Sequence, residues 1–116
     1  MHEFSIALSI IEIAESTAML HDATAVSEVE IEVGNASGVT IEALEFAWES
    51  AAGSSSLLKK SRLIIKPVPL LVQCNNCQYR YTPADLFESC PACSEINSTI
   101  IHGRELKVKS VLLADP

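Results

Sequence analysis

The sequence predicts an α+β fold in which two helices accompany a small three-stranded sheet, with a zinc-ribbon-like module of four cysteines inserted before the last strand. Two observations carry this prediction. Apolar residues recur first with a helical and then with an alternating period, and all four cysteines fall into two C-x-x-C pairs. We therefore expect one domain over 1–68 and 104–116 and a second, zinc-binding domain over 69–103.

The two helices are expected over 4–20 and from 41 to about 53. In the first, serines and Glu12 recur at steps of three and four as a polar stripe, and Leu8 is placed on the opposite, apolar side. Thr40 precedes the second helix and is a residue type that caps helix amino termini. Both helices therefore should bury one side against a sheet.

Three strands are expected over 26–33, 62–66 and 106–113. Pro67 should mark the point where the second strand leaves the sheet, because proline cannot donate to the ladder. In the third strand the apolar alternation changes register near Ser110, which suggests a bulge. The first strand alternates strictly, which predicts a buried face of valines and isoleucine and a wet face of three glutamates: Glu28, Glu30 and Glu32.

Four cysteine thiolates at this spacing can surround one tetrahedral zinc ion: Cys74, Cys77, Cys90 and Cys93. A closed four-sulfur site leaves no position for a substrate, so its role would be structural. A segment with so few apolar residues should need the metal to fold. Structural disulfides, a rubredoxin-like iron site and a redox-active cysteine pair remain alternatives for the same residues.

Charge and hydropathy exclude several classes of protein. The net charge is −7, with −8 in residues 1–60 and +1 in residues 61–116, and this acidity disfavours nucleic-acid binding. The acidic half could attract cations or a basic partner, or could simply be a solvated face. No apolar run reaches the roughly 18 residues of a membrane span, and the start lacks the features of a signal peptide. We expect a cytoplasmic protein.

The first three residues carry a second possible metal site. The Met1 amine, the His2 backbone amide and the His2 imidazole are three nitrogen donors, and the Glu3 amide or carboxylate could complete a square that suits Ni²⁺ or Cu²⁺. The alternative is an ordinary terminal histidine. We interpret His21 as a residue at the end of the first helix and His102 as a turn residue. No nucleophile–base pair, phosphate loop or carboxylate pair suggests an enzyme.

Taken together, the initial Met-His-Glu, the order of helices and strands, the two cysteine pairs and the late Gly103-Arg104-Glu105-Leu106 resemble the hydrogenase nickel-incorporation family HypA/HybF. The resemblance covers essentially the whole chain. It implies a metallochaperone rather than an enzyme, with Ni(II) as its cargo and structural Zn²⁺. Nickel would bind His2 with Met1 and Glu3 as contributors, and zinc would bind the four cysteines.

The resemblance also implies partners. They are a HypB-type GTPase and the large subunit of [NiFe]-hydrogenase, with urease as a second recipient in some bacteria. A two-stranded stalk would permit a homodimer by exchange of the zinc module. The alternative function is a zinc-ribbon adaptor that binds protein or nucleic acid. Family members often have glycine after each cysteine pair, where this chain has Gln78 and Ser94, so the turn conformation there needs testing.

Overall fold

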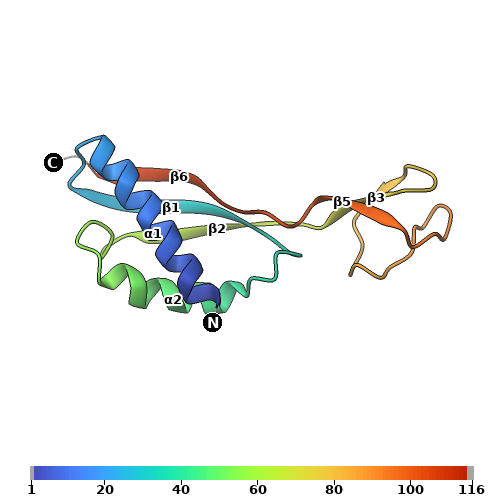
Figure 1. Cartoon of the computed structure of the whole chain (residues 1–116), viewed down its shortest axis with the longest axis horizontal. Helices are drawn as coiled ribbons and strands as arrows, with labels where there is room; N and C mark the ends of the chain where they lie inside the picture. The colour runs from blue at the N-terminus through green and yellow to red at the C-terminus, as the bar shows by residue number, and fades with distance from the viewer. Residues whose placement is uncertain (1, 115–116) are drawn as a thin grey trace.

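The structure is a computed structural model that describes residues 2–114, arranged as two three-stranded sheets at opposite ends of an elongated molecule (Figure 1). The first sheet has β1 (Ala25–Gly34) at its centre, parallel to β2 (Arg62–Val68) and antiparallel to β6 (Leu106–Ala114). Two helices, α1 (His2–Leu20) and α2 (Ile41–Gly53), lie with this sheet. The predicted α+β fold is confirmed.

The second sheet lies in the segment that carries all four cysteines, here called the cysteine module. In it β3 (Leu71–Cys74) is central and pairs antiparallel with β4 (Arg80–Tyr81) and β5 (Ser98–His102). The chain reaches this sheet from β2 and returns from it into β6, so the module is an insertion between two strands of the first sheet. Within residues 2–114, neither helix combines the length and the apolar character needed to cross a membrane.

The main core lies between the helices and the first sheet. Its most enclosed large side chains are Ile31, Leu44 and Leu58, and Trp48 also lies within it. A second, smaller group of buried residues lies in the cysteine module and does not join the first. It consists of Leu70, Val72, Cys74, Tyr81 and Cys90.

The buried side of α1 differs from the prediction at one residue. Leu8 was expected on the apolar stripe, but it is 44% exposed, whereas Ile10 is only 5% exposed. The buried residues Ala7, Ile11 and Ala14 define an arc that Ile10 shares, and Leu8 falls about 60° beyond the edge of this arc. The expectation for Leu8 is therefore wrong.

The alternation of β1 is confirmed. Val29, Ile31 and Val33 are buried, and the intervening glutamates lie on the other face. Arg62 pairs with Glu28 at 3.7 Å, and two lysines of β6 pair with Glu32 at 3.4 and 3.6 Å. Such surface pairs stabilise little, but they partly neutralise the acidic strand. A solvated face is thus the better interpretation of these glutamates.

The bulge predicted near Ser110 is also present. Glu30 pairs with Ser110 and the next residue of β1, Ile31, pairs with Val108, so Lys109 has no partner in the ladder. The extra residue lets Val108 and Val111 both pack against the main core. By contrast, Pro67 does not end β2, because it lies within that strand opposite Val33. An edge strand tolerates it, since its missing N–H can face away from the ladder.

Candidate metal centre

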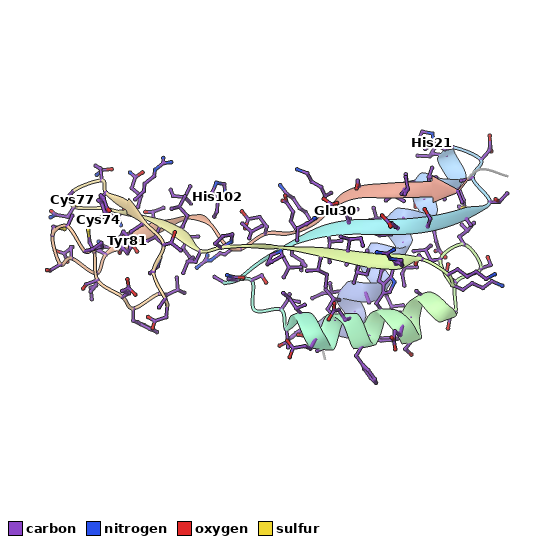
Figure 2. The ribbon with its side chains drawn as sticks, turned by 180° about the vertical axis from the view of Figure 1, so that it is seen from behind. His21, Glu30, Cys74, Cys77, Tyr81 and His102 are labelled. Atoms are coloured by element: carbon purple, nitrogen blue, oxygen red, sulfur yellow. The ribbon has the colours of Figure 1, made fainter. Side chains whose placement is uncertain are left out.

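The four cysteines meet at the far end of the molecule from the helices (Figure 2). Cys74 ends β3 and Cys77 follows in the turn, while the second pair comes from the loop before β5. Their sulfur atoms all lie within 4.8 Å of one another. Cys74 and Cys90 are buried and Cys77 is exposed. Among residues 2–114 these four side chains form the only group of three or more candidate metal ligands that lie so close together.

The distances between the sulfurs suit a tetrahedral ion. Cys74 Sγ lies 3.5 Å from Cys93 Sγ, and Cys77 Sγ lies 3.7 Å from Cys90 Sγ. A disulfide would need about 2.0 Å, whereas the edge of a tetrahedron with Zn–S bonds of 2.3 Å is about 3.8 Å. All four cysteines are free. The arrangement therefore fits one metal ion with four sulfur ligands. The geometry of the four sulfurs is compatible with either zinc or iron.

Each cysteine pair closes a tight turn. The Gln78 N–H donates to the Cys74 carbonyl at 3.0 Å, and the Ser94 N–H donates to the Cys90 carbonyl at 2.8 Å. Gln78 and Ser94 both have φ of 68°, the left-handed conformation that favours glycine. The chain thus keeps the turn that glycine usually supplies, and accepts the backbone strain of a larger residue.

Without a cation, two of the four thiols have opposite pKa shifts. The Asn76 side-chain amide and the Glu95 backbone N–H favour the Cys93 thiolate and lower the pKa of Cys93 to about 6. The Tyr79 backbone N–H favours the Cys77 thiolate, but desolvation and the three other sulfurs outweigh it and raise the pKa of Cys77 to about 12. A divalent ion would remove this conflict, because it binds the thiolate form of each ligand.

The other histidines lie outside this centre. His102 is exposed and its Nδ1 lies 3.1 Å from Glu105 Oε2, while Glu105 Oε1 accepts the Gly103 N–H at 2.7 Å. These contacts stabilise the connection between β5 and β6. His21 is exposed just beyond α1. Neither histidine belongs to the cysteine group, in keeping with the turn and helix-end interpretations.

The second candidate site lies at the start of α1, at the helical end of the molecule. His2 is the first residue of the helix and is exposed. Met1, the third predicted contributor, lies outside the described residues. Glu3 is half-buried, and its Oε2 accepts the Thr40 N–H at 3.1 Å. This backbone N–H, ahead of the Glu3 N–H itself, lowers the pKa of the Glu3 carboxyl.

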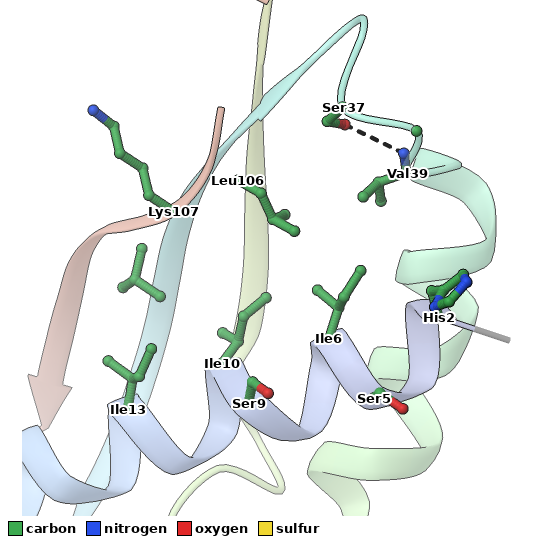
Figure 3. Close-up of a pocket in the computed structure, with 12 residues that line it drawn as sticks. His2, Ser5, Ile6, Ser9, Ile10, Ile13, Ser37, Val39, Leu106 and Lys107 are labelled. Carbon is green, nitrogen blue, oxygen red and sulfur yellow. Dashed lines mark hydrogen bonds between the residues drawn. The ribbon is translucent and has the colours of Figure 1, made fainter. Parts of the chain in front are cut away.

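A groove beside this terminus was missed from the sequence. It has a volume of about 580 Å³ and runs between α1, the segment before α2 and the start of β6 (Figure 3). Ile6, Ile10 and Leu106 supply apolar walls, and His2 lies at one end. Its residues come from three distant parts of the chain, so no local pattern in the sequence marks it.

The fold and the cysteine cluster define a small metal-binding α+β protein. The family model described as hydrogenase/urease nickel incorporation, metallochaperone, hypA matches residues 1–113, and the chain belongs to this family. The family consists of metallochaperones rather than enzymes, as the sequence predicted.

Named relatives agree with this assignment. The hydrogenase maturation factor HypA of Parabacteroides distasonis is 42% identical over 113 residues, covering 97% of each chain. That of Picosynechococcus sp. is 39% identical over 111 residues, covering 96% of this chain and 97% of the relative.

Solved structures share the fold. A solution structure of HypA protein superposes with a TM-score of 0.75 at 25% identity, covering 100% of this chain and 98% of the other. A solution structure of the Ni metallochaperone HypA from Helicobacter pylori gives a TM-score of 0.69 at 23% identity, covering 98% of both chains, and supports the fold alone.

Proposed function

We propose that this protein is a nickel metallochaperone that binds Ni(II) at its amino terminus and delivers it for maturation of [NiFe]-hydrogenase. The observation that carries the proposal is the position of His2, which is exposed in the first turn of a helix. The first amides of a helix have no intrahelical partner. A metal can therefore displace their protons without breaking the helix.

The proposed ligands are the His2 imidazole and backbone amide, with contributions from Met1 and Glu3. Nitrogen donors in a plane suit Ni²⁺, and anionic amides suit the positive end of the helix dipole. Such a small, open set should give roughly micromolar affinity, about −8 kcal/mol. Moderate affinity suits a protein that must release its cargo.

The proposed role of zinc is structural. Cys74, Cys77, Cys90 and Cys93 would hold one Zn²⁺ in a closed site that supplies folding energy to its surroundings. The separation of the two buried clusters supports two domains, 1–68 with 104–116 and 69–103. The second cluster is small, which suits a domain that needs a metal to fold.

The proposed partners follow from the family. They are a HypB-type GTPase and the hydrogenase large subunit, in the cytoplasm and without nucleic acid. The family description names urease beside hydrogenase, so urease is a second candidate recipient. A homodimer formed by exchange of the zinc module remains part of the proposal.

The test is a nickel titration of untagged, zinc-loaded protein that keeps its native Met1. One nickel per chain should bind to the parent, and His2→Ala should lose it while zinc stays at one per chain, both counted by mass spectrometry. His21→Ala is the matched control, since it removes an exposed histidine elsewhere. Absence of nickel binding by the parent would favour the zinc-ribbon adaptor instead.

A further inference from the structure

The amino end of α2 is completed by a residue from α1. Thr40 has the extended backbone of an N-cap, with φ of −86° and ψ of 116°, but its side chain makes no capping hydrogen bond. Its own N–H instead donates to the carboxylate of Glu3, 37 residues earlier. The preceding amide, that of Val39, donates to Ser37 Oγ at 3.2 Å. Both amides at the approach to α2 are thus satisfied by side chains.

The Glu3 carboxylate therefore lies where two helices begin. It belongs to the first turn of α1 and contacts the backbone immediately before α2. Helix amino termini carry partial positive charge, which favours an anion at this place. The Glu3 side chain is half-buried there, and its Oε2 accepts the Thr40 N–H at 3.1 Å.

We propose that the Glu3 carboxylate is a positioning group, which holds the His2-bearing turn of α1 against the amino end of α2, and that it does not ligate the nickel. This deepens the proposed function and rests on it. In this proposal the Glu3 backbone amide binds the metal, and the Glu3 side chain keeps that part of the backbone ordered. Without the bond to Thr40, metal binding would itself have to order the turn, at a cost in conformational entropy.

The first test removes the Thr40 N–H donor and leaves the Glu3 carboxylate in place. It therefore distinguishes a positioning group from a nickel ligand. Thr40→Pro deletes the N–H at a residue whose φ is close to the range of proline, and it leaves His2 and Glu3 intact. Nickel affinity should fall about ten-fold, the size expected for losing one hydrogen bond to a charged group. Thr40→Ser keeps the amide and is the matched control, with affinity like that of the parent.

Changes at Glu3 supply the second arm. Glu3→Ala should weaken nickel binding by a similar factor, and Glu3→Gln, which keeps an oxygen acceptor, should recover part of the loss. The visible absorption spectrum of bound nickel reports its ligands, and it should be the same in Glu3→Ala as in the parent. The double variant Glu3→Ala/Thr40→Pro should bind nickel no more weakly than Glu3→Ala, because Thr40→Pro then removes a donor whose acceptor is already absent.

Two results would overturn the proposal. One is a changed nickel spectrum in Glu3→Ala together with parent-like affinity in Thr40→Pro, which would make the carboxylate a ligand. The other is parent-like affinity in both Glu3→Ala and Thr40→Pro. Failure of the proposed function looks different, since then the parent itself would bind no nickel or His2→Ala would bind as well as the parent.

The metal-free protein gives an independent readout. Exchange of the Thr40 amide hydrogen with solvent should be faster in Glu3→Ala than in the parent, whatever happens to nickel. Should Thr40→Pro fail to fold, as judged by circular dichroism and zinc content, this exchange rate and the nickel spectrum of Glu3→Ala still decide the question. Unchanged exchange would refute the positioning bond.

Discussion

A Cβ atom built on Gly34 would lie 2.0 Å from the carbonyl oxygen of Gly103, closer than any two such atoms can approach. Gly34 ends the central strand β1 and Gly103 follows β5, so their contact marks the joint between the two sheets. The Gly34 N–H donates to the Glu105 carbonyl at 2.7 Å, which holds the two segments together. Gly103 itself has φ of 127°, open only to glycine without strain.

This contact predicts that Gly34→Ala destabilises the protein by at least about 3 kcal/mol, because backbone atoms cannot yield as side chains do. Gly53→Ala is the matched control, since a Cβ there meets nothing within 4 Å. At the end of α2 that change should be neutral or stabilise by up to about 1 kcal/mol. Chemical denaturation followed by circular dichroism measures both, and equal stabilities would contradict the close contact.

The left-handed residues predict a gain from glycine. Ser94→Gly should relieve the strain at φ of 68° and tighten zinc binding by about two- to five-fold, measured by competition with a chelator. Gln78→Gly should gain less, because Gln78 Oε1 also accepts a hydrogen bond from Gln73. Ala92→Gly is the control without positive φ, and it should weaken zinc binding slightly. A weaker site in Ser94→Gly would speak against strain there.

Metal removal should affect the two sheets unequally. The cysteine module has a small buried cluster, so removing the proposed zinc with a chelator should unfold it. Trp48, the one tryptophan of the chain, lies in the main core and should keep the fluorescence of a buried indole. Cys90→Ser should behave likewise without a chelator. A shift of Trp48 emission toward that of solvent-exposed indole on chelation would show that the main core also depends on the metal.

The contacts of Glu105 predict a pH dependence. Its own backbone N–H and that of Gly103 lower the pKa of the Glu105 carboxyl below 4.5. A carboxyl with a lowered folded-state pKa stabilises the fold above its unfolded pKa, and this stabilisation is lost as the pH falls through the folded value. When the pH is lowered from 6 to below 4.5, the thermal unfolding temperature of Glu105→Gln should therefore fall less than that of the parent. Glu45→Gln, on the exposed face of α2, serves as the control and should behave like the parent.

Much of the fold could be predicted because its signals are local. The alternation of β1 and the register change at Lys109 both follow from spacing along one strand, and the structure confirms them. Leu8 shows where such reasoning fails. A helical period defines an apolar side only approximately, and the packing of α1 against α2 and the first sheet decides that Ile10 is buried while Leu8 is not.

For the candidate sites, the sequence by itself determined the residue types and their spacing: four cysteines that can share one ion and a histidine at the second position. Only the tertiary structure decided that Glu3 meets Thr40 and that Gly34 meets Gly103, because these contacts join segments 37 and 69 residues apart. Residues that act together and lie close to one another in the chain can be recognised from the sequence alone. Contacts between distant segments depend on how helices and strands pack, which no local pattern encodes.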